Sequence, residues 1–421
     1  MALKRVPIDQ LTVGMYVAGC DRSWLQTPFL VHSFLIKSQE QIDKLARAEI
    51  RHVDIDTEKG ADCPSPSHDA VETPQASIHK TESTLPDYGQ RQTATSGTRA
   101  ARTLNGSSRA AEFAEARRER QRMLESVRNV LRSVYMSGCV QAAEIKQVSE
   151  KMIARTLELD HALVALIRTR EFDPQLYDHA VAVGILCIAL GRTMGYDDRW
   201  LQHLAEGALL HDIGLLYMPD RLLKPGRPLT EPEQREFDAH VQIGVDLLNK
   251  SVGIPKEVVR LVREHHSASM TEADADQSPS AQCCRVLKVV DAYDQLLSGQ
   301  GGTEPLSHRE ALQQLYVLAQ QGRFDLKIVS QLITLVGIYP IYSLVELSTG
   351  HRGIVINVNA SDLLRPLLYL THGADHAPFD EPILLDLAIQ SDENTPVQIV
   401  GMLDAEKEGV RVEDVLRGQL V

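Results

Sequence analysis

Histidine and aspartate side chains occur along this chain in an order that suits the binding of metal ions. The strongest element is the adjacent pair His211-Asp212, which closes the apolar run 208–210. Imidazole and carboxylate groups together are the usual ligands of iron, manganese or zinc. One aspartate can bridge two metals because its carboxylate has two oxygens. We expect Gly214 to end the helix that carries the pair.

The other candidates lie in apolar sequence, where an imidazole or carboxylate without a partner would be costly. His179 comes near the start of a predicted helix, and His265-His266 closes another. Asp291 is followed one helical turn later by Asp294. For any single histidine, a satisfied core or surface residue is the more common explanation. The ordered set nevertheless predicts one metal site, formed by His179, His211, Asp212, His240, His265, His266 and Asp291.

Helices must position these residues, because apolar residues recur at three- and four-residue spacing from Arg109 to Val336. The stripe from Met123 to Val134 is most simply a packing surface, and a dimerising helix is the alternative. Beyond this region the pattern changes. Segments 343–347 and 353–358 favour a hairpin around Gly350. Short strands are predicted at 365–369 and 383–387.

The first part of the chain differs from the helical region. Residues 50–56 alternate apolar and polar, which predicts a half-buried strand, and helical spacing precedes it from residue 39. Residues 57–108 are rich in Pro, Ser and Thr, a composition typical of a flexible linker. We predict a mainly α protein with four parts: a small N-terminal α/β domain (1–56), a linker (57–108), a helical metal-binding domain (109–337) and a C-terminal β extension (338–421).

Composition excludes several functions. The formal net charge is -13 and aromatic residues make up 5%, which argues against binding of DNA or single-stranded nucleic acid. Phosphate groups would therefore need local cations, and bound metals are a ready source. Six cysteines are scattered without a CxxC pair, so no disulfide framework is expected. The sequence has no signal-peptide pattern and no run of about 18 apolar residues, so we expect a cytoplasmic protein without a membrane span.

The order of the seven residues resembles the binuclear metal site of the HD-GYP family. Members of that family are helical phosphodiesterases that hydrolyse cyclic di-GMP in bacteria. The likeness includes His-Asp-Ile-Gly at 211–214 and the segments 219–226, 290–294 and 309–312. Residues 339–366 are similar to the β extension of the family.

Residues 1–56 resemble a short domain of unknown function that often precedes HD-GYP domains. This likeness is carried by Gly14-Met15-Tyr16-Val17, Asp21-Arg22-Ser23-Trp24 and Thr27-Pro28-Phe29.

The resemblance implies an HD-type helical bundle that binds two divalent transition-metal ions, iron or manganese. Asp212 would be the bridging, catalytic residue. His179, His211 and Asp291 would hold one metal, and His240, His265 and His266 the other. It also implies a cyclic dinucleotide as the substrate. Signalling proteins or a second copy of the chain are expected as partners.

The chain departs from the family at positions that would grip a substrate. Residues 267–274 replace the Glu-Arg-x-Asp-Gly-x-Gly-Tyr-Pro segment, and residues 298–303 replace an Arg-rich turn. Leu215 stands where the family has lysine, so Leu215→Lys is expected to improve binding. Gln175 replaces the glutamate of members with a third metal, which makes a third metal doubtful.

Three functions follow from these matches and departures. The first is a cyclic-di-GMP phosphodiesterase with weak activity, acting on the cyclic or linear dinucleotide. The second is a catalytically inactive, metal-binding regulatory or interaction protein. The third is a phosphohydrolase of another nucleotide.

The linker prediction can be tested by limited proteolysis. We expect the first cuts within 57–108 and a stable fragment that begins near Arg109, because the linker composition is poor in apolar residues. Mass spectrometry of the fragments reads out the cut sites. Early cleavage inside 109–337 with an intact linker would show that the domain boundaries are wrong.

Overall fold

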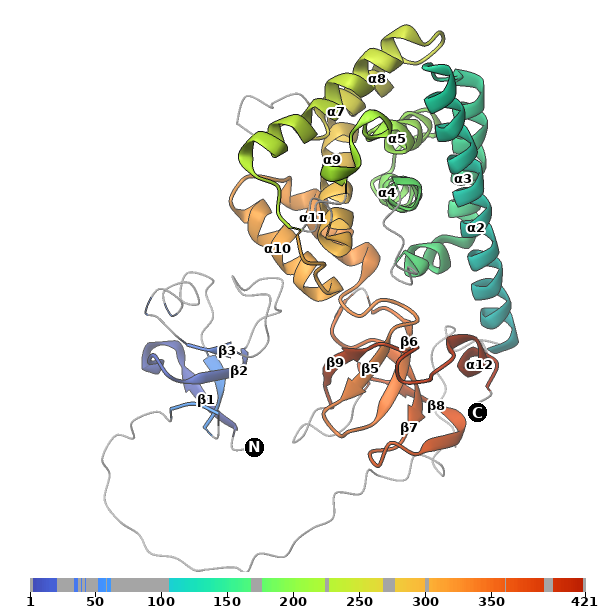
Figure 1. Ribbon diagram of the computed structural model, residues 1–421. Coiled ribbons are helices and arrows are strands. Elements are labelled where there is room, and N and C mark those ends of the chain that lie inside the picture. Colours follow the sequence, from blue (N-terminus) through green and yellow to red (C-terminus); the bar gives the residue numbers. More distant parts are fainter. Residues whose placement is uncertain are drawn as a thin grey trace, which may run out of the picture. The chain divides into compact units, whose positions relative to one another are not determined.

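The structure, a computed structural model, describes residues 3–20, 34–36, 39, 42, 52–57, 59–61, 106–167, 176–223, 227–267, 277–299, 303–359, 361–389 and 397–418. The chain forms two compact units, Met1–Arg102 and Thr103–Val421 (Figure 1). Most of the predicted linker and most of the predicted helix at 39–49 lie outside the described residues. The domain boundaries drawn from the sequence therefore stay a prediction.

The first unit contains a small antiparallel sheet of order β1-β4-β2-β3. Its strands are β1 (Leu3–Pro7), β2 (Tyr16–Cys20), β3 (Phe34–Leu35) and β4 (His52–Asp56), with the 3-10 helix η1 (Ile8–Gln10) after β1. The predicted strand at 50–56 is β4, and its inward residues Val53 and Ile55 are fully buried. They pack with Val6, Met15 and Val17 into one apolar cluster.

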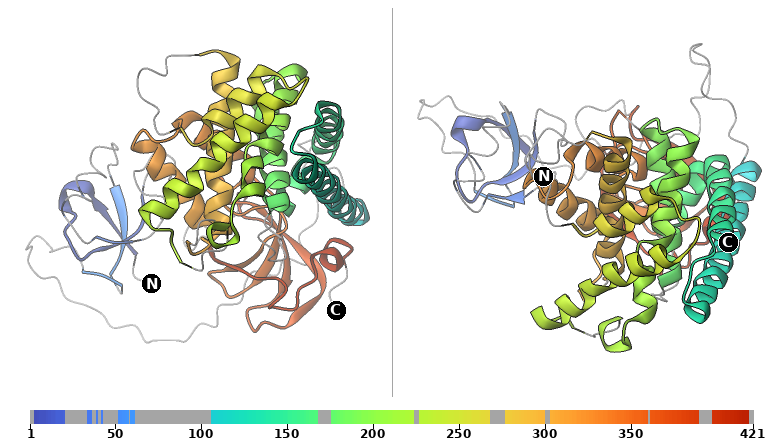
Figure 2. Two further views of the ribbon diagram at one scale, coloured as in Figure 1. Left: turned by 45° about the horizontal axis from the view of Figure 1, so that its top comes forward. Right: turned by 90° about the horizontal axis from the view of Figure 1, so that it is seen from above.

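The second unit is built mainly from helices, as the sequence predicts. These are α2 (Gly106–Ser137), α3 (Ala142–Leu166), α4 (Leu176–Thr193), α5 (Asp198–Leu210), η3 (Ile213–Tyr217), α6 (Asp220–Leu223), α7 (Glu231–Lys250), α8 (Lys256–Glu264), α9 (Pro279–Ser298), α10 (His308–Gln320) and α11 (Leu326–Val336). The long helices α2 and α3 lie side by side along one edge of the bundle (Figures 1 and 2).

Helix α4 lies at the centre of the helical unit, where it packs against α2, α3, α5, α9 and α11. It is the one helix of the described chain that is long and apolar enough to cross a membrane by length and composition. However, 72% of it is buried inside the protein. Its apolar composition is therefore explained by burial on all sides in the bundle.

A second sheet follows the helices, and it confirms the predicted β extension and with it the expected mainly α fold class. Its order is β8-β7-β6-β5-β9. The strands are β5 (Leu344–Leu347), β6 (Arg352–Asn357), β7 (Leu367–His372), β8 (Pro378–Asp386) and β9 (Ile399–Leu403), and α12 (Val412–Leu416) comes last. The predicted hairpin is β5–β6, and Gly350 has the positive φ of 82° that its turn requires.

Gly214 has a different role from the one predicted. Helix α5 already ends at Leu210, and Gly214 lies within η3 without a positive φ. A Cβ atom at this position would lie 1.9 Å from the carbonyl oxygen of His240. Glycine is therefore required because the backbones of η3 and α7 touch here. This contact brings His240 close to the His211-Asp212 pair.

We predict that Gly214→Ala displaces α7 and weakens metal binding. The added methyl group meets rigid backbone, so we expect a loss on the order of 3 kcal/mol in the free energy of unfolding. Thermal unfolding and metal analysis would measure both effects. Gly401→Ala is the control, since a Cβ at Gly401 meets nothing within 4 Å. Equal stability of the two variants would contradict the close-contact explanation.

Candidate metal centre

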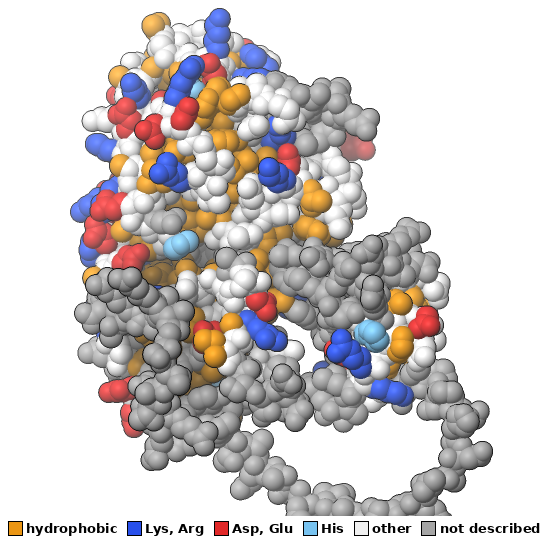
Figure 3. All heavy atoms as spheres, turned by 180° about the vertical axis from the view of Figure 1, so that it is seen from behind, with side chains coloured by type: hydrophobic (Ala, Val, Ile, Leu, Met, Phe, Trp, Pro, Cys, Tyr) orange, Lys and Arg blue, Asp and Glu red, His pale blue; other side chains and the backbone are white. Residues whose placement is uncertain are grey.

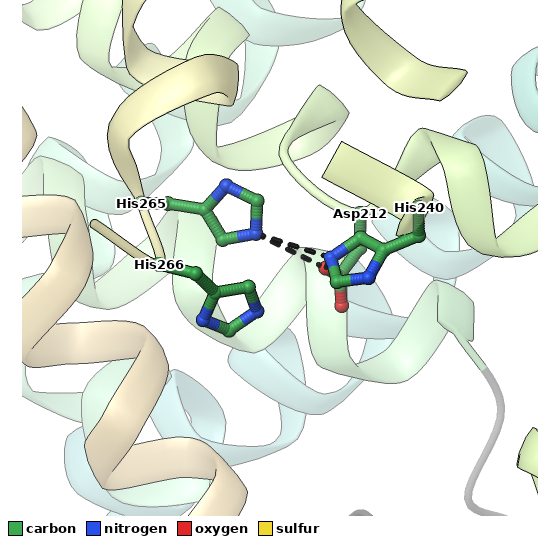
Figure 4. A group of neighbouring side chains, drawn as sticks. All are labelled: Asp212, His240, His265 and His266. Carbon is green, nitrogen blue, oxygen red and sulfur yellow. Dashed lines mark hydrogen bonds and ion pairs between the residues drawn. The ribbon is translucent and has the colours of Figure 1, made fainter. Parts of the chain in front are cut away.

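The carboxylate of Asp212 lies at the centre of the predicted site and is 2% exposed. Its Oδ2 is 3.5 Å from Nε2 of both His179 and His211. Its Oδ1 is 3.2 Å from Nε2 of His240 and 3.5 Å from Nε2 of His265 (Figure 4). The two oxygens of one carboxylate therefore face two different sets of imidazoles.

All seven residues selected from the sequence come together here. The ligand atoms of His179, His211 and Asp212 lie within 4.8 Å of one another, and so do those of Asp212, His240, His265 and His266. Asp291 joins the first set, because its Oδ1 is 3.1 Å from Nε2 of His179 and 3.5 Å from Nε2 of His211. We call these the His179 set and the His240 set. They share Asp212.

Five helices supply the two sets. His179 lies in the first turn of α4, His211 and Asp212 directly follow α5, and His240 lies in α7. His265 and His266 follow the last turn of α8, and Asp291 lies in α9. Ligands that come from helix ends and packed helix faces are held by the core of the bundle, which gives them fixed positions.

The orientation of three imidazoles is fixed by the backbone. Nδ1 of His211, His240 and His265 each donates to the carbonyl oxygen three residues earlier, over 2.8, 2.6 and 2.7 Å. A neutral imidazole has only one N–H, so each Nε2 is left as an acceptor that faces Asp212. Metal-binding histidines commonly have their second nitrogen held in this way.

The Nε2 atoms of neighbouring imidazoles lie so close together that their lone pairs would repel each other unless a cation lay between them. Nε2 of His179 is 3.0 Å from Nε2 of His211, and Nε2 of His240 is 3.4 Å from Nε2 of His265. If Nδ1 carries the only N–H of each ring, two lone pairs face each other in each pair, and a proton or a metal ion between them removes the repulsion. Among the described residues, neither oxygen of Asp212 has a hydrogen bond of good geometry. Nitrogen and oxygen donors arranged in this way fit a divalent transition metal.

The electrostatics of the cluster lead to the same conclusion. Burial lowers the pKa of His179, but hydrogen bonds with Asp291 and Asp294 outweigh it and raise this pKa to about 10. Burial raises the pKa of Asp212 and Asp291, yet the surrounding imidazoles hold both well below their usual range. The buried carboxylates are therefore stable as anions only beside positive charge, which a proton or a metal can provide.

Asp294 also belongs to the cluster, although the sequence does not predict it as part of the site. It is fully buried, and its Oδ2 lies 2.6 Å from Nδ1 of His179. The neighbouring Gln295 donates from Nε2 to both oxygens of Asp291, over 2.9 and 3.0 Å. Asp294 thus orients His179, and Gln295 orients Asp291. The one-turn spacing from Asp291 is the sequence signal for Asp294.

Leu215 does not face the ligands. It is 4% exposed and packs with Leu222 and Phe237 in an apolar cluster. A lysine here would place an ammonium group among apolar side chains, which is costly. The expected gain from Leu215→Lys therefore has no support in the structure. Gln175, residues 268–274 and residues 300–302 lie outside the described residues.

His266 lies at the open side of the cluster. It is exposed, whereas the other six ligand candidates are buried. Desolvation by neighbouring protein groups, together with the adjacent His265, still lowers the pKa of His266 to about 4. The imidazole is therefore neutral near pH 7, as a metal ligand must be.

Comparison with known families agrees with this geometry. Residues 163–328 match the family described as "HD domain", and this match contains all seven ligand candidates. HD domains bind divalent metals, and the histidine and aspartate cluster described above agrees with this property. Residues 3–145 match the family described as "Domain of unknown function (DUF3391)". The chain thus carries a match to an HD domain at 163–328 and, ahead of it, a match to DUF3391 at 3–145, which confirms the expected resemblance.

Three curated relatives are phosphodiesterases by name. Cyclic di-GMP phosphodiesterase PA4108 of Pseudomonas aeruginosa is 29% identical over 86% of this chain and 84% of its own length. Cyclic di-GMP phosphodiesterase response regulator RpfG of Xanthomonas campestris is 27% identical over 46% of this chain and 57% of its own. The 3'3'-cGAMP-specific phosphodiesterase 2 of Vibrio cholerae is 27% identical over 37% of this chain and 30% of its own.

We predict that Asp294→Asn weakens metal binding about tenfold, the lower end of the effect of removing an outer-shell partner. The amide keeps an acceptor for Nδ1 of His179 but removes the negative charge. Calorimetric titration of metal-depleted protein measures the effect. Asp246→Asn is the control, because Asp246 is exposed on α7 and accepts only from Gln242 among the hydrogen bonds described. Unchanged affinity in Asp294→Asn would rule out an orienting role.

Proposed function

We propose that this chain is a metal-dependent phosphodiesterase that hydrolyses cyclic di-GMP, or its linear product, in bacterial second-messenger signalling. The observation that carries the proposal is the shared carboxylate of Asp212, whose two oxygens face two imidazole sets. Its position within an HD domain supports hydrolysis of a phosphate ester. The relatives named cyclic di-GMP phosphodiesterases support the substrate class.

In this proposal the two sets hold two divalent metals, iron or manganese. His179, His211 and Asp291 would hold one metal, His240, His265 and His266 would hold the other, and Asp212 would contribute one carboxylate oxygen to each set. Two such ions supply Lewis acidity toward a phosphodiester and lower the pKa of water. The residues contribute fixed imidazole positions, which avoid reorganisation during the reaction. The exposed side of His266 marks where a dinucleotide would reach the site.

The charge of the protein makes substrate binding the weaker part of the function. The net charge is -13, and exposed charges of both signs are interspersed with apolar side chains on the face seen in Figure 3. Such a surface offers no long-range attraction for a dianionic substrate. Leu215 contributes no cation to the site, because its side chain is uncharged and packs in an apolar cluster. We therefore infer weak turnover with a raised KM.

Two other functions remain candidates for specific reasons. A catalytically inactive, metal-binding interaction protein is favoured by the absence of a Gly-Tyr-Pro segment after His265-His266. A phosphohydrolase of another nucleotide is favoured by the relative named as specific for 3'3'-cGAMP. A cytoplasmic location, a homodimer and signalling-protein partners stay predictions from the sequence.

The proposal predicts close to two metal ions per purified chain and slow hydrolysis of cyclic di-GMP. His211→Ala with Asp212→Ala should lose most of the metal and lower turnover by more than about 10²-fold, because the shared carboxylate and an imidazole are removed. Elemental analysis and chromatography of the products measure both. His161→Ala, an exposed position on α3, is the control. Parallel assays with 3'3'-cGAMP identify the preferred substrate.

The outcomes separate the three functions. Metal-loaded protein that gives no product from any of these dinucleotides supports the interaction protein. Faster hydrolysis of 3'3'-cGAMP supports the third function. Leu215→Lys should lower the midpoint of thermal unfolding without improving turnover, because the position is buried among apolar side chains. A rise in turnover would show that this side chain reaches the substrate.

A further inference from the structure

Helix α2 contacts the first turn of α4 directly beside His179. Arg120 of α2 forms an ion pair with Asp178, and the two side chains are only 15% and 16% exposed. Two helical turns later, the guanidinium of Arg128 lies 5.5 Å from the ring centroid of Tyr177. Both contacts involve the residues that immediately precede His179 in the chain, Tyr177 and Asp178.

The same helix also reaches the segment that follows Asp212. The hydroxyl group of Tyr217, the last residue of η3, donates to the carbonyl oxygen of Val134 over 3.1 Å. The rings of Tyr217 and Tyr135 lie 5.7 Å apart. Helix α2 therefore touches two of the three chain segments that supply the His179 set, α4 and η3, whereas the third segment, α9, carries Asp291.

The first turn of α4 is held from two directions. Asp294 of α9 binds the imidazole of His179, and Arg120 of α2 binds the adjacent carboxylate of Asp178. The arginine has a planar, rigid guanidinium, so its contact with a carboxylate fixes direction as well as distance. A metal site depends on such contacts behind its ligands, because a small displacement of a ligand lowers the affinity for the metal.

The family matches give α2 an unusual position. The DUF3391 match covers residues 3–145 and so contains all of α2, whereas the HD match begins at residue 163. By packing, however, α2 belongs to the second unit, Thr103–Val421, together with the ligand-bearing helices. Helix α2, which lies within the DUF3391 match, thus packs on segments of the HD match that carry ligand candidates.

We propose that Arg120 is a positioning residue of the metal centre: through Asp178 it fixes the first turn of α4, so that metal affinity of the His179 set depends on a helix of the DUF3391 region. This inference rests on the proposed function, since it requires that the His179 set binds a metal. It assigns the DUF3391 region a role in the metal centre, and it makes α2 the route by which that region can alter the His179 set without altering the His240 set.

The test is a calorimetric titration of metal-depleted, full-length protein with Mn²⁺. We expect two sites in the wild type. In Arg120→Gln we expect about tenfold weaker binding at one site and no change at the other. The weakened site should be the one that His179→Ala removes. Arg120→Lys keeps the charge and should recover part of the affinity. Arg122→Gln is the matched control, because Arg122 is 68% exposed and pairs with Glu119 of its own helix.

A double-mutant cycle tests whether the effect passes through Asp178. Asp178→Asn should weaken the same site, and adding Arg120→Gln to it should cause little further loss. The midpoint of thermal unfolding is measured for each metal-free variant. Equal weakening of both sites with a lower midpoint would show that Arg120 only stabilises the bundle, and would overturn the inference.

Two further results separate this inference from the proposed function. If Arg120→Gln binds Mn²⁺ as Arg122→Gln does, the inference fails while the metal centre stands. If the wild type takes up no Mn²⁺, the proposed metal centre fails and the inference fails with it. Should Arg120→Gln not fold, the comparison of Arg120→Lys with Asp178→Asn decides the matter in the same titration.

Discussion

The structure of the helical unit depends on one buried carboxylate surrounded by imidazole nitrogens. Asp212 lies where α5 ends, and four imidazole Nε2 atoms approach its two oxygens from opposite sides. Such a group of acceptors repels itself unless positive charge is present. The packing of five helices must therefore be tight enough to hold the group together. The packing also leaves one side of the cluster open, where the exposed His266 lies.

The close packing around this carboxylate explains features that are otherwise unrelated. Gly214 lets η3 touch the backbone of α7, and the buried core helix α4 presents His179 from its first turn. The apolar cluster that contains Leu215 holds η3 from its other side. Each of these features sets the distance between a ligand and Asp212. Most of the ligand candidates lie at or next to helix ends, so the positions of these ends relative to one another determine the geometry of the cluster.

The sequence predicts the ligand candidates, but it does not predict the residues that support them. Spacing and residue type identified all seven ligand candidates, and periodicity identified the helices and the β5–β6 hairpin. The one-turn spacing of Asp294 from Asp291 indicates a shared helix face, but it does not predict that Asp294 is the partner of His179, because that contact joins two helices. The sequence predicts Gly214 as a helix stop, because close contact with a distant backbone is a tertiary property that local pattern does not reveal. The short strand β9 and helix α12 gave no clear periodic signal.

The hydrogen bonds from Nδ1 to the carbonyl three residues earlier have an evolutionary consequence. For His211, His240 and His265 the direction of the imidazole is set by the backbone of the helix that carries it, and no loop takes part. Loops around the opening can then change in length and composition while the ligands keep their aim. A metal centre assembled in this way can be retained when the substrate-binding loops around it change. New substrate specificities can then arise through changes in the loops alone.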